Sequence, residues 1–496
     1  MKVLNIFKTR LDKKNSSLEG MIWTFAERIC AQLVSTIVGI ILARMLAPDD
    51  YGIISIVMIF ITICNVFVTR GFGTTLVQKK DIDEADYNTA FYMSTILGVL
   101  LYLLLYFAAP MIAEIYKISQ LTDVLRVLGL RIPIAALNTI QQAYIQRTMQ
   151  FRKFFVATII GTIASCVAGI AMAYSGYGVW ALVAQYLTNV IIDTVILCFV
   201  SGWRPGMSFS QDRMHYIWSF GGKILLADLI SSITDNFRNL IVGKAFGSRE
   251  LAFLDQGNKY PKLLTGNINA SIQKVMLPSF SSTQDDLQRL KISLRHSVNL
   301  SAYIVTPVLI GFIAISENFV KVILTDKWLP AVPFICIACI SYLSRAFETM
   351  CHQAILALGY SGTVLKILIF TNCVDIFLIL ATAVFFRNLF VMAFTAILTE
   401  VCSVACSCKI ASNFLKYSIR EQLSDTVPYL IISCIMGGAV YCIGIIAISK
   451  AVIFIVQIMA GILLYVAFSR AFGLKAFEYL KSFILARLLG RKKPQC

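Results

Sequence analysis

Polar and charged side chains recur at helical spacing inside long apolar runs of this 496-residue chain. Positions i, i+4, i+7 and i+11 lie on one face of an α-helix. Ionisable side chains among apolar residues are costly, and they usually face a cavity or a charged partner. We therefore expect one face of each of three helices to line a water-filled space. Their residues are Arg28, Gln32, Ser35 and Gly39; Asp228, Ser232, Asp235 and Asn239; and Asp255, Lys259, Lys262, Gly266 and Asn269.

Two of the cations occupy equivalent places in an internal repeat. Residues 22–26 (IWTFA) match residues 217–221 (IWSFG) at an offset of 195, and this offset places Arg28 on Lys223. A cleft lined by Arg and Lys attracts an anion such as a phosphate or a carboxylate. The sequence predicts a substrate site at Arg28 and Lys223, with Gln32, Lys259 and Lys262 as further contacts. The alternative is that both cations reach out to lipid headgroups.

Several acids on the same helices could couple transport to an ion. Asp235 lies on a polar stripe with Asp228 two turns before it and Arg238 one turn after it, and Glu27 precedes Arg28. A buried acid can exchange H⁺ or Na⁺ as a transporter changes conformation. The sequence predicts a coupling role for Asp235, Asp228, Arg238 and Glu27. The alternative is structural, with Asp235–Arg238 and Arg345–Glu348 as fixed ion pairs.

The motifs of common enzymes are absent from the sequence. It has no GxxxxGK[ST] phosphate loop, no GxSxG nucleophile turn and no HExxH zinc motif. Its three His residues are not at ligand spacing, and we interpret Cys402, Cys406 and Cys408 as packing residues. We expect neither an enzyme, a cofactor nor a metal site. The net charge of +17 follows from basic residues between apolar runs, so nucleic acid is not an expected partner.

Composition identifies the elements that position these side chains. The chain is 58% hydrophobic and 14% charged, whereas soluble proteins carry about 25% charged residues. A bilayer core needs about 20 apolar residues per helix. The sequence predicts an all-α integral membrane protein. Its fourteen expected spans are 21–43, 53–70, 88–112, 122–145, 154–174, 178–200, 216–242, 252–283, 297–315, 331–357, 363–386, 389–410, 425–447 and 451–469, the eighth broken by Gly257, Pro261 and Gly266.

The distribution of Lys and Arg predicts the orientation. With the N-terminus in the cytoplasm, 26 of the 44 Lys and Arg lie in inside segments and 8 in outside loops, which favours both termini inside. The repeat predicts two parallel six-helix lobes followed by two further helices. The expected divisions are an amphipathic tail at 1–20, rather than a cleaved signal, lobes at 21–200 and 201–423, two spans within 424–469, and a basic tail at 470–496.

Short motifs in a fixed order resemble a known family. The stretch Leu42–Gly52 is similar to the first outside loop of bacterial polysaccharide flippases of the Wzx type, in the multidrug/oligosaccharidyl-lipid/polysaccharide exporter superfamily. The resemblance covers roughly residues 20–365. It departs at Asp255, where such proteins often carry Asn, and at 359–361, where Gly-Arg-Ser is common. The other similar stretches are 71–73, 87–91, 146–147, 151–153, 176–183, 256–262 and 325–333.

The resemblance implies a two-lobed transporter in the bacterial cytoplasmic (inner) membrane. Its substrate would be a polyprenyl-diphosphate-linked oligosaccharide, used to build lipopolysaccharide O-antigen, capsule or exopolysaccharide. Because the sequence has no phosphate loop for ATP, the energy for transport would come from a gradient of H⁺ or Na⁺, or from the substrate gradient itself. Membrane lipids, and a polymerase and glycosyltransferases of the same pathway, would be its partners.

Three other functions remain open on the sequence alone. A cation-coupled multidrug exporter of the same superfamily would have an acidic rather than a basic cleft. A lipid II flippase shares the anionic substrate, although the motifs fit the polysaccharide branch better. A membrane polysaccharide polymerase would need a large outside loop, and no expected outside loop exceeds roughly twenty residues.

Overall fold

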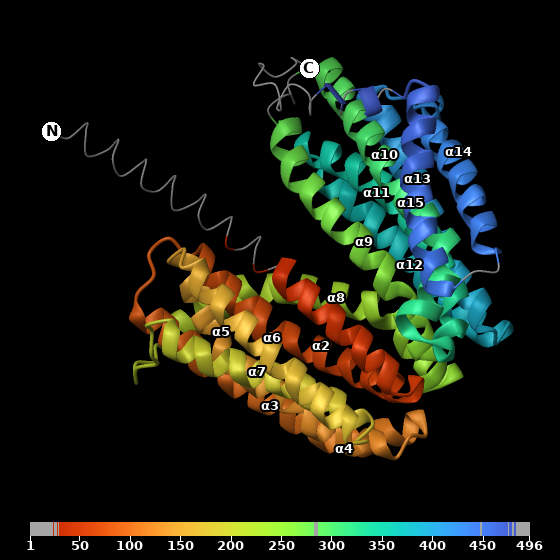
Figure 1. Cartoon of the computed structure of the whole chain (residues 1–496). Coiled ribbons are helices and arrows are strands. Elements are labelled where there is room, and N and C mark those ends of the chain that lie inside the picture. Colours follow the sequence, from red (N-terminus) through yellow and green to blue (C-terminus); the bar gives the residue numbers. More distant parts are fainter. Residues whose placement is uncertain are drawn as a thin grey trace. The chain divides into compact units, whose positions relative to one another are not determined.

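All regular structure in the described part of the chain is helical (Figure 1). The computed structural model describes residues 23, 27, 29–281, 286–446, 449–474, 476–478 and 481–482. The expected tail at 1–20 and most of the basic tail at 470–496 lie outside these residues. Contacts divide the chain into two compact units, Met1–Ala252 and Phe253–Cys496.

The first unit is a bundle in which α2 contacts α3, α5 and α8, while α6 packs along α7. Its helices are Ile29–Met45, α2 (Pro48–Gln78), α3 (Glu84–Tyr116), α4 (Gln120–Gly129), α5 (Arg131–Arg147), α6 (Phe151–Tyr174), α7 (Val179–Val200) and α8 (Gln211–Phe246).

The expected span 122–145 is interrupted in the structure. It consists of α4 and α5, which meet at Leu130. Pro133 explains the interruption, because it has no N–H to donate and its ring would clash with the carbonyl of Gly129 in a continuous helix. The interruption matters for function because it places Arg131 at the first position of α5.

Two glycines bring α6 and α7 into close contact. A Cβ atom on Gly161 would lie 3.3 Å from the carbonyl oxygen of Asn189, and one on Gly169 would lie 3.0 Å from Cβ of Gln185. Small residues eight positions apart lie on one helix face and allow two membrane helices to approach closely. Larger side chains at these positions would push α6 away from the polar row on α7.

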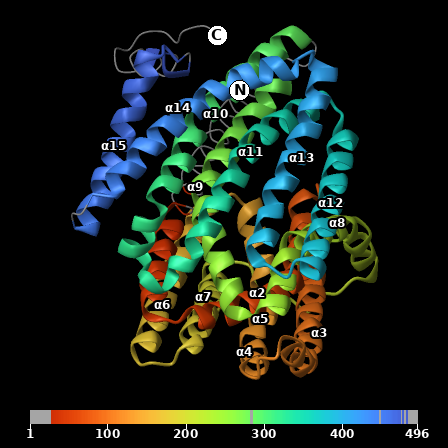
Figure 2. The same cartoon turned by 90° about the vertical axis from the view of Figure 1, so that its right-hand side faces the viewer.

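The second unit contains α9 to α15. Within it α10 contacts α11, α14 and α15, and α13 contacts α11 and α12. In the turned view α14 and α15 lie on one side of this unit and α12 and α13 on the other (Figure 2). The helices are α9 (Ser248–Ser281), α10 (Leu287–Phe319), α11 (Val332–Ala357), α12 (Ser361–Phe385), α13 (Leu389–Leu415), α14 (Ile419–Gly444) and α15 (Lys450–Ala471), with a π turn (Val320–Leu324) and a 3₁₀ helix (Asp326–Ala331) between α10 and α11.

The expected break in the eighth span is wrong, because α9 runs continuously from Ser248 to Ser281. Gly257 serves packing instead of a break. A Cβ atom there would lie 2.5 Å from Cβ of Phe334, so only glycine lets α9 approach α11 at this point. Membrane helices tolerate Gly and Pro when neighbouring helices pack against them.

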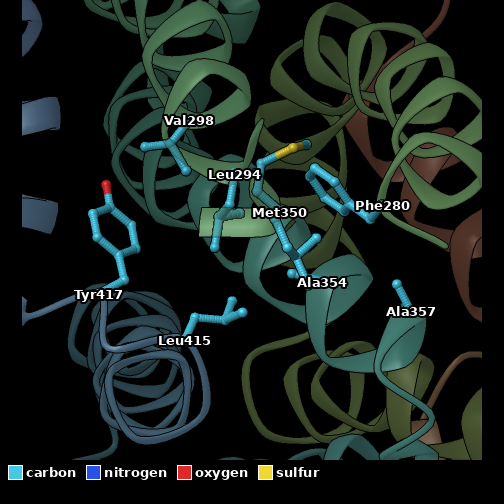
Figure 3. Packing of buried hydrophobic residues seen from close by; sticks show 9 residues of the cluster. Phe280, Leu294, Val298, Met350, Ala354, Ala357, Leu415 and Tyr417 are labelled. Atoms are coloured by element: carbon cyan, nitrogen blue, oxygen red, sulfur yellow. The ribbon is translucent and has the colours of Figure 1, made fainter. Parts of the chain in front are cut away.

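A buried apolar cluster holds the ends of several helices of the second unit together (Figure 3). Leu294 and Val298 of α10 meet Met350 and Ala354 of α11, and Tyr417 lies just beyond the end of α13. Met350 and Ala354 are completely buried. The cluster holds α11 against α10 and α13. Its residues Met350 and Ala354 alternate along α11 with the polar residues Glu348 and His352.

The helices have the apolar outer faces of a multi-pass membrane protein. Ten helices in the described part are long and apolar enough to cross a bilayer, and they match ten of the fourteen expected spans. Phe377 and Phe385 of α12 are 69% and 81% exposed, which suits contact with lipid rather than water. The other four expected spans are also helical in their described residues: Ile29–Met45, α4 with α5, α8, and α9.

Those four differ from the ten for identifiable reasons. The first helix is described continuously only from Ile29, and Pro133 divides α4 from α5. Helices α8 and α9 carry the charged stripes that lower their apolar character. The boundary between the two units also lies after Ala252 and not after residue 200, because α8 contacts α2 and α3 of the first unit. The repeat and the packing therefore give different boundaries, and the two lobes stay a prediction.

Candidate functional site

A polar cavity of about 340 Å³ lies inside the first unit. It is surrounded by residues of the first helix and of α5, α6 and α7. Most of the side chains around it carry a polar group, although the helices around it face outward with apolar residues. Its lining residues are Glu27, Ala31, Gln32, Ser35, Arg131, Thr162, Ser165, Cys166, Gln185, Tyr186 and Asn189.

Helix α7 contributes a row of amides to this cavity. Gln185 and Asn189 are four residues apart and therefore point to the same side of the helix. Thr162 and Ser165 face them from α6, which Gly161 and Gly169 hold close to α7. Amide and hydroxyl groups can both donate and accept hydrogen bonds, so this wall suits a ligand rich in hydroxyl groups.

Arg131 contributes a positive charge to the cavity. Its guanidinium lies 5.5 Å from the ring centre of Tyr186, and Nη1 is 3.8 Å from Sδ of Met58. Among the described side chains, no carboxylate lies within ion-pair distance of Arg131. The guanidinium is therefore available to bind an anionic group.

Two acids converge near this cavity. Glu27 lines it, and its charge acts on Asp193, one turn beyond Asn189 on α7. The Oδ1 atom of Asp193 is buried and has no hydrogen-bond partner. Two carboxylates that repel each other in a buried place favour binding of a proton or a cation.

The structure brings two of the nine predicted site residues into the cavity. Gln32 and Glu27 both line it, together with Ser35 of the same predicted stripe. The Nε2 atom of Gln32 donates to Oγ1 of Thr36 at 3.3 Å. Arg28 lies outside the described residues, and the side chain of Lys223 on α8 is likewise not described. Their predicted pairing therefore stays a prediction.

The remaining predicted residues lie elsewhere. On α8, Asp235 is exposed, Asp228 and Arg238 are half-buried, and none of the three lines the cavity. Asp235 forms no ion pair with any described residue, so the structure does not contain the Asp235–Arg238 pair of the alternative interpretation. In the second unit, Nζ of Lys259 lies 5.9 Å from the ring centre of Tyr260, and Lys262 is exposed.

The sequence analysis did not identify three residues that give the cavity its charge and its amide groups: Arg131, Gln185 and Asn189. A pattern for α7 was present, because Gln185, Asn189 and Asp193 are spaced by four and share one helix face. No pattern in the sequence marked Arg131, since its place in the cavity depends on the interruption at Pro133 and on the packing of α5 beside α7.

The described residues contain no group of three or more His, Cys, Asp or Glu side chains that could hold a metal ion. The thirteen cysteines among them are all free thiols. The half-buried Cys402 and Cys406 lie on α13.

Comparison with known sequences places the chain in one family. The family profile described as "Polysaccharide biosynthesis protein" matches residues 41–333. The teichuronic acid biosynthesis protein TuaB of Bacillus subtilis is 22% identical over 69% of this chain and 71% of its own length. The lipopolysaccharide biosynthesis protein WzxC of Escherichia coli is 19% identical over 67% and 68%. A putative O-antigen transporter of Shigella flexneri is 24% identical over 68% and 82%.

Two solved structures share the fold of this chain. The lipid II flippase MurJ, in an inward closed conformation, superposes with a TM-score of 0.73 and 14% identity, over 92% of this chain and 98% of the other. An inward-facing multidrug resistance transporter of the MOP superfamily superposes with a TM-score of 0.62 and 13% identity, over 78% and 96%. Since the family profile matches more than half of the residues, this multi-pass membrane protein belongs to the polysaccharide biosynthesis protein family.

Proposed function

We propose that the chain flips polyprenyl-diphosphate-linked oligosaccharides from the inner to the outer leaflet of the bacterial cytoplasmic membrane, for the synthesis of a surface polysaccharide. The polar cavity inside a lipid-facing bundle is the observation that carries this proposal. A sugar headgroup cannot cross the hydrocarbon core without replacements for its hydrogen bonds to water. The cavity offers such replacements.

The cavity residues suit the two parts of such a headgroup. Gln185, Asn189 and Gln32 would hydrogen-bond sugar hydroxyls, and Tyr186 would pack against a sugar ring. Arg131 would bind the diphosphate with its planar guanidinium, which can contact two phosphate oxygens at once. The polyprenyl tail would stay in the bilayer. Arg28, Lys223, Lys259 and Lys262 are further proposed contacts for the same anionic group.

Relatives support the choice of substrate. The names of TuaB, WzxC and the Shigella protein refer to teichuronic acid, lipopolysaccharide and O-antigen. The chain is accordingly proposed to transport a substrate and to catalyse no covalent step, with the polymerase and glycosyltransferases of the same pathway as its partners.

We propose fourteen membrane spans, with both termini in the cytoplasm, arranged as two six-helix lobes and two further helices. The lengths of α8 and α9, 36 and 34 residues, suffice for a bilayer core of about 30 Å at 1.5 Å per residue. The bias of 26 inside to 8 outside Lys and Arg supports the orientation.

Reporter fusions test this topology. Fusions after residues 48, 116, 176, 247 and 327 should report the outside, and fusions after 80, 150, 208 and 290 the inside. An inversion in the middle of the series would contradict the fourteen-span arrangement and the parallel lobes together.

Transport by alternating access needs an energy source, and we propose a gradient of H⁺ or Na⁺. Three of the predicted coupling residues, Asp235, Asp228 and Arg238, lie on α8. The fourth, Glu27, lines the cavity of the first unit, where its charge acts on Asp193.

Reconstitution tests the proposed function directly. The full chain is placed in proteoliposomes with a polyprenyl-diphosphate oligosaccharide, and an impermeant oxidant measures which leaflet holds the sugar. We expect the chain to equilibrate the lipid between leaflets, and Arg131→Ala to reduce the rate. Lipid II and a cationic dye serve as rival substrates. Transport of either one without transport of the oligosaccharide lipid would favour a lipid II flippase or a multidrug exporter instead.

A further inference from the structure

We propose that Glu348 and His352 of α11 form a proton-binding pair that couples the second unit to the proton gradient. This inference rests on the proposed function for its transport role, whereas proton binding itself can be measured without any substrate. Neither residue was among the predicted site residues.

The pair is defined by contacts within α11 and across to α13. The Nε2 atom of His352 lies 3.6 Å from Oε1 of Glu348, one helical turn away. Oγ of Ser403 donates a hydrogen bond to the same Oε1, and Oγ of Ser407 lies 3.1 Å from Nε2 of His352. Each titratable group therefore has one hydroxyl partner on the neighbouring helix.

The two contacts between α11 and α13 join residues with the same separation in the sequence. Glu348 meets Ser403 and His352 meets Ser407, at the same sequence separation of 55. Equal separations mean that α11 and α13 run in the same direction at this point. A sliding of one helix along the other would break both contacts together. Proton binding and the relative position of α11 and α13 are therefore linked.

Because both side chains are mostly buried, a net charge on the pair is energetically unfavourable. The side chains of Glu348 and His352 are only 10% and 13% exposed. An ionised carboxylate in such a place is unfavourable unless a positive charge or a proton accompanies it. No described Lys or Arg forms an ion pair with Glu348, and Arg345, expected to be its partner, is exposed. His352 is therefore the partner that can neutralise Glu348.

The other titratable groups within one turn of the pair and its partners include Arg345 on α11 and Glu400 and Lys409 on α13, together with thiols. Cys351 on α11 and Cys406 on α13 interact electrostatically with Glu348, and Lys409 acts on Cys406. Helices α10 and α12 also pack against α11. Among the described residues of these two helices, none forms a hydrogen bond or an ion pair with the pair. Arg295 of α10 binds Asp425, and Asp375 of α12 accepts from Thr399.

The chemistry of the pair involves one proton. With neutral His352 and ionised Glu348 the pair carries one negative charge, and Ser407 donates to Nε2 when the imidazole carries its hydrogen on Nδ1. Uptake of a proton from water gives a neutral pair, in which Nε2–H points to the carboxylate or the carboxyl holds the proton. Release of the same proton to water on the other side restores the charge. No bond other than O–H or N–H changes.

Infrared titration of the full chain in lipid nanodiscs measures proton binding. We expect a buried carboxylic acid band that grows as the pH falls. The part of this band that belongs to Glu348 should be missing in Glu348→Gln, which keeps the side-chain shape and can still accept from Ser403. The band should titrate at a different pH in His352→Gln and stay unchanged in Glu317→Gln, an exposed control on α10. An unchanged titration in Glu348→Gln would overturn the proposal.

Ser407→Ala provides a milder variant in case Glu348→Gln fails to fold. It removes the hydroxyl that donates to neutral His352 in the tautomer with its hydrogen on Nδ1, so the form without the extra proton loses stabilisation. The pair should therefore take up its proton at a higher pH. No shift, or a shift to a lower pH, would contradict the assigned role of Ser407 and with it the geometry of the pair.

Transport assays then test coupling. Flipping driven by a pH gradient should fall in Glu348→Gln to the rate measured without a gradient, while exchange in the absence of a gradient should persist. If Asp193→Asn abolishes the gradient response and Glu348→Gln retains it, the coupling site lies in the first unit and this inference is wrong. If wild-type protein shows the Glu348 band but moves no oligosaccharide lipid, the proposed function fails while the proton-binding pair stands.

Discussion

The interiors of the two units use their polar side chains differently. In the first unit, Gln185, Asn189 and Arg131 surround a cavity of about 340 Å³. In the second unit the polar side chains bind one another: Glu348 with Ser403, and Arg295 with Asp425. Polar groups that face an open cavity can bind a ligand, whereas groups that satisfy one another stabilise the fold or exchange a proton. The difference suggests that the first unit holds the headgroup and the second responds to the ion.

The largest effect is expected at Arg131. Arg131→Ala should slow flipping by about tenfold to a hundredfold, because a hydrogen bond to a charged group contributes about 1.5–3 kcal/mol. Arg131→Lys should recover part of the rate, since it restores the charge without the planar fork. The flipping assay in proteoliposomes measures both rates. Equal rates in Arg131→Ala and wild type would show that the cavity cation does not contact the substrate.

A structural counterpart lies in the second unit at Arg295. Its Nε and Nη2 atoms donate to Asp425 at 2.6 and 2.9 Å, and the Tyr417 hydroxyl donates to the same carboxylate at 2.8 Å. Arg295→Ala leaves a mostly buried carboxylate without its cation, so we expect a loss of about 1.5–3 kcal/mol of stability.

Thermal unfolding of the purified protein measures this loss. The matched control is Arg213→Ala in the first unit, where the buried Asp86 keeps Lys79 at 2.6 Å and should lose less. An Arg295→Ala variant with wild-type stability but slow flipping would assign this network to transport instead of folding.

A smaller effect is expected for the amide row. Gln185→Leu and Asn189→Leu should each slow flipping by about fivefold, because each removes hydrogen bonds of about 1 kcal/mol from the sugar. Gln211→Leu, at the exposed start of α8, is the control and should leave the rate unchanged. If the two cavity variants match this control, the amides do not contact the headgroup.

The least change is expected at Asp193. If the proton acts through Glu348 and His352, Asp193→Asn should leave the response to a pH gradient unchanged, although its carboxylate lies near Glu27. The ratio of flipping rates with and without the gradient is the measurement. A ratio that falls to one would place the ion in the first unit and remove the contrast between the two interiors.

The sequence predicted the helices better than the contacts between them. Apolar runs of membrane length located ten of the candidate spans, because the bilayer requires such runs. The interruption before Arg131 was missed, although Pro133 provides its physical reason. The break expected at Gly257 was wrong because this glycine allows close packing with Phe334, a contact far away in the sequence.

For the candidate sites, too, the sequence predicted positions on a helix but not the contacts between helices. Helical spacing found Gln32, which lines the cavity, but could not show that α5 and α7 complete the wall around it. The spacing of Glu348 and Arg345 suggested an ion pair, yet Glu348 contacts His352 and Ser403 instead. Periodicity identifies which side chains share a helix face, whereas the partner of that face depends on tertiary packing.

Photo-cross-linking tests most directly whether the first unit holds the headgroup. A polyprenyl-diphosphate oligosaccharide with a photoreactive group on its sugar is added to the full chain in lipid nanodiscs, and mass spectrometry identifies the labelled residues. We predict labels on α7 around Gln185 and Asn189 and on α5 near Arg131, with excess unlabelled lipid preventing them. Labels confined to α10–α15, with none around the cavity, would contradict the account.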